Sequence, residues 1–163
     1  MDKKYWETIA PKYDEEIFDV LQNDRSGKIV AAIEKIASKE SSVIDIGCAI
    51  GKWVPLLAEN FKFVIAADIS VTNLIIAKEK NAKFTNVEYV AMDMSADTLT
   101  ITPCDVAVCI NAILTDSLPK RINFFQSLNI SINKNGYLVL VVPSLESKLY
   151  TNIIANKIGR AHV

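Results

Sequence analysis

Short apolar runs, rich in β-branched residues, alternate along the chain with longer segments whose apolar residues recur every three or four positions. The short runs predict strands and the longer segments predict helices. We expect strands at residues 42–46, 63–67, 86–90, 105–110 and 137–142. Four of these runs are apolar almost throughout, which is typical of parallel strands buried on both faces. The run at 86–90 alternates apolar and polar residues, so we expect it at an edge of the sheet.

Amphipathic segments precede, separate and follow these strands. They predict helices at residues 27–39, 51–61, 70–81, 118–133 and 144–157. Ser70 is a favourable N-cap, and Asn135-Gly136 is typical of a helix end. The alternation of strands and helices predicts an α/β fold, a doubly wound, Rossmann-like three-layer sandwich around a mostly parallel sheet.

Composition narrows the possible functions. The chain has 163 residues and a formal net charge of −1, so it lacks the basic surface expected of a nucleic-acid-binding domain. No apolar stretch is long enough to cross a bilayer and the first residues do not resemble a signal peptide, so we expect a cytoplasmic protein without membrane contact. The 3 cysteines form no Cys-x-x-Cys pair and His162 is the only histidine, which disfavours a metal site and excludes a Ser-His-Asp triad.

The turn after the first strand, from Asp45 to Gly51, holds two of the 5 glycines in the chain. Glycines in such a turn let a ligand approach the backbone N–H groups at the start of the next helix. A dinucleotide-binding turn needs Gly-x-Gly-x-x-Gly, but Ala49 and Lys52 occupy its second and third glycine positions. Asp45 would also repel a pyrophosphate. The turn therefore favours a ligand with a positive end, although an ordinary α/β turn capped by an aspartate fits the same residues.

Residues 43–51 resemble the first motif of the class I S-adenosylmethionine-dependent methyltransferases, Asp/Glu-x-Gly-x-Gly-x-Gly, with Ala49 in place of the middle glycine. The resemblance implies the strand order 3-2-1-4-5 and S-adenosylmethionine as cofactor. It also implies that the two glycines give room to the methionine part and that Asp45 orients the methionine ammonium group. By this resemblance, the cofactor-binding residues of the loop are Asp45, Gly47, Cys48, Ala49 and Gly51.

Two further acidic residues follow the second and third predicted strands. By the same resemblance, Asp68 accepts hydrogen bonds from both ribose hydroxyls, which a carboxylate can do for a cis-diol. Asp93 then contacts the adenine edge, with Ile69 and Met94 flanking the base. Each acid alone is also compatible with a solvated carboxylate at a strand end. Three acids after consecutive strands are more specific, because ligands of parallel sheets bind outside those strand ends.

Two other segments resemble contact regions of this family. Asn111 follows the fourth strand, where small-molecule methyltransferases offer backbone carbonyls to the methionine end of the cofactor. Tyr13 lies in an N-terminal segment that covers the cofactor in the family, and it would touch the methionine end or the acceptor. A turn or cap role fits Asn111 equally well, and simple packing onto the sheet fits Tyr13.

The end of the chain departs from the family pattern. Members have seven strands, and this chain lacks the last two, which form a hairpin beside the fifth. Residues 157–163 match the translation of a common sequencing adapter. We therefore expect a methyltransferase domain at residues 1–157, incomplete at its C-terminus, followed by a non-native tail at 158–163. The strand at 137–142 would then be an apolar edge.

These features predict methyl transfer from S-adenosylmethionine to an unidentified small-molecule acceptor, with impaired activity in this chain. We assign no catalytic residue, since an amine or thiolate acceptor needs no general base and no side chain identifies itself as one. Two alternatives remain: a non-catalytic S-adenosylmethionine-binding domain and a nicotinamide-dependent oxidoreductase. The oligomeric state cannot be predicted.

Overall fold

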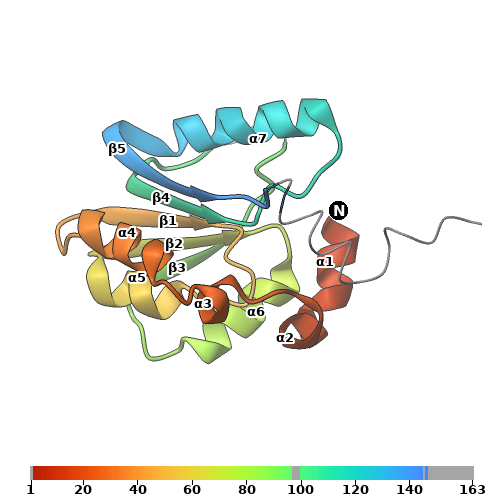
Figure 1. Ribbon diagram of the computed structural model, residues 1–163, viewed down its shortest axis with the longest axis horizontal. Coiled ribbons are helices and arrows are strands. Elements are labelled where there is room, and N and C mark those ends of the chain that lie inside the picture. Colours follow the sequence, from red (N-terminus) through yellow and green to blue (C-terminus); the bar gives the residue numbers. More distant parts are fainter. Residues whose placement is uncertain (1, 97–99, 145, 147–163) are drawn as a thin grey trace, which may run out of the picture.

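A five-stranded sheet forms the centre of the protein, seen in a computed structural model that describes residues 2–96, 100–144 and 146 (Figure 1). The strand order is β3-β2-β1-β4-β5, and every neighbouring pair is parallel. The strands are β1 (Ser42–Ile46), β2 (Phe63–Asp68), β3 (Val87–Ala91), β4 (Cys104–Ile110) and β5 (Ile132–Val141). The predicted α/β class, parallel sheet and 3-2-1-4-5 order are confirmed.

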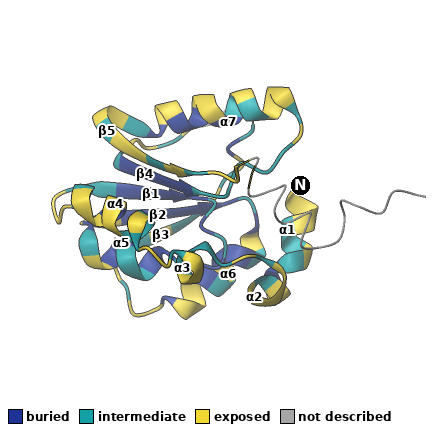
Figure 2. Cartoon of the chain, in the orientation of Figure 1, coloured by how far each residue is buried: buried dark blue, intermediate teal, exposed yellow. Residues whose placement is uncertain are grey.

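Helices cover both faces of this sheet, as Figures 1 and 2 show. One face carries α4 (Lys28–Ile36), α5 (Val54–Asn60) and α6 (Val71–Lys80), and the other carries α7 (Leu118–Ile130). An N-terminal segment precedes them and lies beyond the carboxyl ends of the strands (Figure 1). Its elements are α1 (Lys3–Ile9), the 3₁₀ helix η1 (Ala10–Lys12), α2 (Tyr13–Glu16) and α3 (Val20–Asn23).

Alternating side chains of the central strands fill two separate cores. On one face Val43 and Val106 pack with Leu57 of α5, and on the other Ile44 packs with Phe124 of α7. The strands in the middle of the sheet are therefore buried on both sides, whereas β3 and β5 at the edges are partly exposed (Figure 2). All three cysteines are buried and free of disulfides, with Cys104 and Cys109 on the α7 face.

The helix predicted at residues 118–133 ends earlier, at Ile130. Ser131 ends it, because its hydroxyl donates to the Leu128 carbonyl at 2.8 Å and its own carbonyl accepts the Cys104 N–H at 2.9 Å. β5 therefore begins directly after this turn, opposite the first residue of β4. The difference arises from a pairing between segments far apart in the sequence.

The Asn135-Gly136 pair, predicted to end a helix, lies inside β5, at a register shift between the pairings of Cys104 and Val106. Asn135 has φ 68°, which is unusual for a residue with a β-carbon. A β-carbon on Gly136 would lie 2.6 Å from the Asp105 carbonyl oxygen, so glycine permits the close approach of β5 to β4.

Other predicted boundaries differ by a few residues. The helix predicted at 51–61 begins at Val54, because Gly51 has φ 77° and residues 51–53 form a turn. The helix predicted at 27–39 spans Lys28–Ile36. The helix predicted at 144–157 and the tail predicted at 158–163 lie outside the described residues, apart from 144 and 146.

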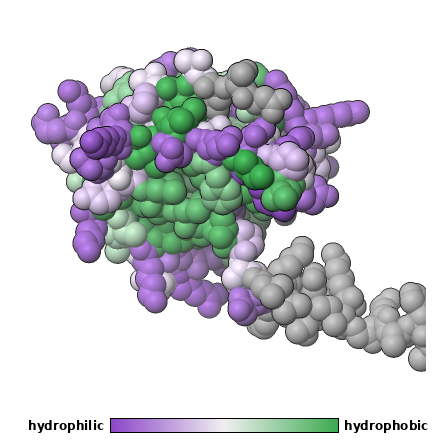
Figure 3. Space-filling view, turned by 90° about the horizontal axis from the view of Figure 1, so that it is seen from above, coloured by the Kyte–Doolittle hydropathy of each residue, from purple (hydrophilic) through white to green (hydrophobic). Residues whose placement is uncertain are grey.

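Apolar side chains gather on the outer surface of α7 and along β5, the side of the molecule seen from above in Figure 3. The exposed residues are Leu118, Ile122, Phe125 and Ile130 on α7 and Tyr137, Leu138, Leu140 and Val142 on or after β5. An apolar edge strand of this kind can pair with another chain, so it favours self-association. No helix in the described part of the chain has the length and apolar character needed to span a bilayer.

Candidate functional site

A cavity of about 510 Å³ opens at the carboxyl ends of the strands, beneath the N-terminal segment. Ligands of doubly wound sheets bind at this position, where the strand order reverses beside β1. The structure brings together nine of the predicted cofactor-binding residues in its wall: Tyr13, Gly47, Cys48, Ala49, Asp68, Ile69, Asp93, Met94 and Asn111. The other two, Asp45 and Gly51, lie beside the cavity and outside its lining.

The loop after β1 is held tightly against β2. The N–H groups of Gly47 and Cys48 both donate to the Ala67 carbonyl, at 2.8 and 3.0 Å. Gly47 has φ 74°, and a β-carbon there would collide with the β-carbon of Ala112, which follows β4. Gly47 therefore allows two strand ends to approach each other at the cavity wall.

Two other loop residues, Ala49 and Gly51, also have positive φ angles. Ala49 replaces the middle glycine of the motif and has φ 48°, a left-handed conformation that costs about 1–2 kcal/mol for a residue with a β-carbon. Gly51, with φ 77°, packs against α6, where a β-carbon would lie 2.7 Å from Asn81 Nδ2. This close packing against α6 explains why residue 51 is a glycine. That Gly51 also gives room to a ligand stays a prediction.

Asp68, the last residue of β2, connects the loop to the first turn of α6. Its Oδ2 accepts the Ala49 N–H at 2.9 Å, and its Oδ1 accepts the Ser70 N–H at 2.8 Å and Asn73 Nδ2 at 3.2 Å. Burial raises the pKa of Asp68, while these hydrogen bonds act in the opposite direction. The carboxylate thus fixes the cavity wall in addition to facing any ligand.

Asp45 lies within the sheet on the same face as Val43, and only 1% of its surface is exposed. Its Oδ2 has no hydrogen-bond partner among the described residues. Burial raises the pKa of Asp45 to about 7, and the neighbouring Asp68 carboxylate adds to this rise. A positively charged group close to Asp45 would stabilise its ionised form.

This raised pKa makes a testable contribution to stability. A protonated Asp45 stabilises the folded protein fully below pH 3.8, and this contribution declines with rising pH and is lost above about pH 7. We therefore expect Asp45→Asn to gain stability relative to the wild type between pH 5 and pH 8, by an amount on the order of 3 kcal/mol. Urea unfolding of both proteins at the two pH values measures the difference.

Asp105→Asn is the matched control. Asp105 is the second residue of β4 and lies outside the cavity lining. The Ser42 N–H holds the pKa of Asp105 below its ordinary value, so this carboxylate stays ionised over the same range. The stabilising contribution of Asp105 should fall only in acid. The difference in unfolding free energy between Asp105→Asn and the wild type should therefore be constant between pH 5 and pH 8. An equally constant difference for Asp45→Asn would contradict the prediction.

The predicted adenine side of the cavity follows β3. Asp93 is exposed, and its Oδ1 accepts the Ser95 N–H at 2.9 Å and the Ser95 hydroxyl at 2.7 Å. Met94 is buried and Ile69 is partly buried, and both present apolar surface to the cavity. The Asp93 Oδ2 is not used in these bonds, so the carboxylate keeps an acceptor for a ligand.

Asn111 directly follows β4 and lines the cavity. It has φ 55°, and its N–H donates to the Val141 carbonyl at 2.8 Å. This left-handed turn brings Ala112 against Gly47. The structure therefore supports a turn role for Asn111 and places the residue in the cavity wall as well.

The N-terminal segment covers the cavity through aromatic and polar contacts. Tyr13 lies 6.5 Å from Trp6 between ring centres, and both side chains line the cavity. The Glu7 carboxylate accepts the N–H groups of Val71 and Thr72 at 2.8 and 3.1 Å, which caps the start of α6. Hydrogen bonding, first of all with the Thr72 side chain, lowers the pKa of Glu7 to about 2.

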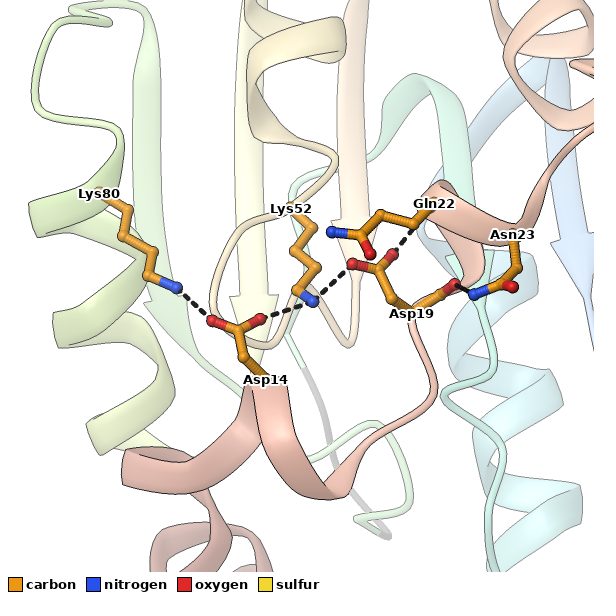
Figure 4. Close-up of polar contacts among 6 residues, drawn as sticks. All are labelled: Asp14, Asp19, Gln22, Asn23, Lys52 and Lys80. Atoms are coloured by element: carbon orange, nitrogen blue, oxygen red, sulfur yellow. Dashed lines mark hydrogen bonds and ion pairs between the residues drawn. The ribbon is translucent and has the colours of Figure 1, made fainter.

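Lys52, the residue after the loop, ties this segment down (Figure 4). Its Nζ lies 2.6 Å from an oxygen of Asp14 and 2.6 Å from an oxygen of Asp19, while Lys80 contacts the second oxygen of Asp14 at 2.8 Å. Each contact joins residues far apart in the sequence. The network fixes α2 and the start of α3 over the loop.

Several cavity residues were not predicted from the sequence. In the sequence Lys52 stands out only as a departure from a dinucleotide motif, although a lysine directly after a glycine-rich loop is well placed to reach a covering segment. Phe18 was not singled out in the sequence, and in the structure 68% of its surface is exposed. The main unpredicted lining residues are Trp6, Phe18, Lys52, Asn73, Ser95 and Lys120. Within the described ranges, no three His, Cys, Asp or Glu side chains gather to hold a metal ion.

Comparison with known proteins identifies the family. A profile described as a methyltransferase domain matches residues 43–136, more than half of the chain. No curated protein sequence matches significantly. Together with the fold, this match identifies a class I S-adenosylmethionine-dependent methyltransferase domain. The chain belongs to the methyltransferase domain family, and S-adenosylmethionine is the cofactor of this class.

Solved structures share the fold at low sequence identity. The DhpI–SAM–HEP complex has a TM-score of 0.70 and 18% identity, and the match covers 92% of this chain and 68% of DhpI. The N-methyltransferase NodS of Bradyrhizobium japonicum WM9, in complex with S-adenosyl-L-homocysteine, has a TM-score of 0.68 and 14% identity, covering 83% of this chain and 70% of NodS.

A third similar structure belongs to a much longer protein. Phosphoethanolamine N-methyltransferase 1 of Haemonchus contortus has a TM-score of 0.64 and 19% identity, and the match covers 83% of this chain but 31% of that enzyme. Its complex contains phosphoethanolamine and S-adenosylhomocysteine. At these identities the likeness shows the fold.

Proposed function

We propose that the chain binds S-adenosylmethionine in the cavity beneath its N-terminal segment and transfers the methyl group to a small-molecule acceptor. The observation that carries this proposal is the convergence of the Gly47 loop, Asp68 and Asp93 on one cavity at the carboxyl ends of three consecutive strands. These segments are separate in the sequence, and a purely structural role for each would not require a shared cavity.

The chemistry of the cavity fits this cofactor. Asp68 and Asp93 line it, and Asp45 lies beside it with an unpaired, fully buried oxygen. Three carboxyl groups at one site suit a ligand with hydroxyl and amino donors and positive charge, and they oppose a pyrophosphate. The nicotinamide alternative is therefore not favoured.

Each residue has a binding or positioning role in the proposed reaction. When bound, S-adenosylmethionine supplies a methyl group made electrophilic by its sulfonium. Asp68 receives the ribose, Asp93 with Met94 and Ile69 receives the adenine, and Asp45 stabilises the positive methionine end. Gly47 and Asn111 shape the wall against which the methionine part lies. Positioning of the two reactants is the main source of rate enhancement for such a transfer.

The acceptor would enter under the N-terminal segment, beside Tyr13 and Trp6. DhpI was solved with HEP and the Haemonchus enzyme with phosphoethanolamine, and these small ligands support a small-molecule acceptor here. The cavity lining also includes Phe18, Lys3 and Lys120, which offer both apolar and cationic contacts. We assign no general base, since an amine acceptor reacts without one once its nitrogen is deprotonated.

Calorimetric titration of the purified chain with S-adenosylmethionine tests the proposal, with S-adenosylhomocysteine and NAD as comparison ligands. We expect both adenosyl ligands to bind in the micromolar range and NAD not to bind. A methyl-transfer assay with a panel of small amines, phosphonates and thiols then tests the reaction. Binding without product across the panel would favour a non-catalytic cofactor-binding domain, and preferential binding of NAD would contradict the proposal.

A further inference from the structure

Asn73 is a buried amide in the cavity wall that the sequence did not single out. It lies in the first turn of α6 with only 1% of its surface exposed, and its N–H donates to the Ser70 hydroxyl at 3.1 Å. Its side-chain Nδ2 donates to Asp68 Oδ1 at 3.2 Å. Its Oδ1 is buried and has no hydrogen-bond partner among the described residues.

The orientation of this amide is fixed by its neighbour. An ionised carboxylate only accepts hydrogen bonds, so the NH₂ group of Asn73 must face Asp68 and the oxygen must point elsewhere. Buried polar atoms in native proteins are nearly always hydrogen-bonded, and an exception needs an explanation. Since Asn73 lines the cavity, a donor on a bound ligand is the explanation that the geometry offers.

Asp68 already accepts three hydrogen bonds, which leaves it little capacity for both hydroxyls of a ribose. A carboxylate has about four acceptor positions. Three are occupied by the N–H of Ala49, the N–H of Ser70 and Nδ2 of Asn73. While these contacts persist, Asp68 has room for one hydroxyl, and the second hydroxyl of a cis-diol needs another acceptor close by.

We propose that Asn73 Oδ1 accepts one ribose hydroxyl of the bound cofactor while Asp68 accepts the other, so that the diol is recognised by an aspartate–asparagine pair. This inference rests on the proposed binding of S-adenosylmethionine. It would satisfy the unpaired amide oxygen after a small shift of the wall, because that oxygen is buried in this structure. It also makes Asn73 a specificity-determining residue for ribonucleosides over deoxyribonucleosides.

Deoxy forms of S-adenosylhomocysteine test the pairing, because this ligand binds without turnover. Calorimetry compares S-adenosylhomocysteine with its 2′-deoxy and 3′-deoxy forms on the wild type and on Asn73→Leu, which has no acceptor. We expect the wild type to bind each deoxy form about tenfold to 100-fold more weakly. In Asn73→Leu, the preference for one hydroxyl should fall below about threefold while the preference for the other remains.

The ratio of the affinity for S-adenosylhomocysteine to the affinity for each deoxy form shows whether Asn73 contacts a hydroxyl. A purely structural effect would weaken the binding of all three ligands together and leave these ratios unchanged. Thr72→Val, at the neighbouring position outside the cavity lining, should leave both ratios unchanged. Asn73→Ser, whose shorter side chain cannot reach the same point, gives the same test if the leucine variant does not fold.

Two results would overturn the inference: both hydroxyl preferences persisting in the Asn73 variants, or a wild type indifferent to both hydroxyls. A wild type that binds none of the three ligands would instead contradict the proposed function itself. Loss of one preference alone, in the Asn73 variants and not in Thr72→Val, would support the aspartate–asparagine pair.

Discussion

Gly47→Ala should destabilise the protein by about 3 kcal/mol and weaken cofactor binding by about 100-fold. The alanine would have to adopt the left-handed conformation with φ 74°, which costs about 1–2 kcal/mol. Its β-carbon would also collide with Ala112. Relief of this collision would separate the loop after β1 from the end of β4, and displacement of a ligand-contacting loop by about 1 Å is enough for a large loss. Urea unfolding and calorimetric titration with S-adenosylhomocysteine measure the two effects.

Gly27→Ala is the matched control for the backbone term. Gly27 also has a left-handed conformation, with φ 63°, but a β-carbon there would meet no atom within 4 Å. Its substitution should cost about 1 kcal/mol and leave ligand affinity unchanged. Equal losses of stability in the two variants would show that the close approach of Gly47 to Ala112 does not contribute to the destabilisation.

Asp68→Ala should lower cofactor affinity by about 100-fold and reduce stability by about 3 kcal/mol. The substitution leaves the N–H of Ala49, the N–H of Ser70 and Nδ2 of Asn73 without their acceptor, and unsatisfied buried donors cost about 1–3 kcal/mol each. It also removes a charged acceptor for the ribose, and hydrogen bonds to charged groups contribute about 1.5–3 kcal/mol. Denaturant unfolding and calorimetry give both values.

Asp68→Asn keeps the shape and one acceptor oxygen, so it should be less destabilised than Asp68→Ala. Burial raises the pKa of Asp68, and the neutral amide avoids the desolvation of the charge. Its affinity for the cofactor should lie between those of the wild type and the alanine variant. If alanine and asparagine proved equally destabilising, the three hydrogen bonds to Asp68 would not be the source of the effect.

The sheet was predictable because its central strands are mostly apolar. A strand such as β1, buried on both faces, shows its position through composition alone. The start of β5 was not predictable in this way. Its polar residues between Ile132 and Tyr137 match a helix end locally, and their place in a strand depends on the pairing of Ile132 with Cys104. Such long-range contacts leave no periodic signal.

The candidate site was predictable as far as it depends on strand ends. A carboxylate directly after a parallel strand must lie at the same edge as its neighbours, and Asp68 and Asp93 line one cavity accordingly. Asn73 could not be found by that reasoning, because its role depends on how many donors Asp68 already accepts. Lys52 likewise acquires its partners, Asp14 and Asp19, only through the folding back of the N-terminal segment.

The three buried thiols make the unmodified chain a reporter of its own local opening. Cys48 lies in the loop after β1, whereas Cys104 and Cys109 mark the first and the sixth residue of β4. Burial raises the pKa of each thiol, so we expect each to react slowly with a disulfide reagent until its surroundings open. Exchange rates at the three positions, followed by mass spectrometry, therefore map how an added compound redistributes stability between the two ends of one strand, without any engineered label.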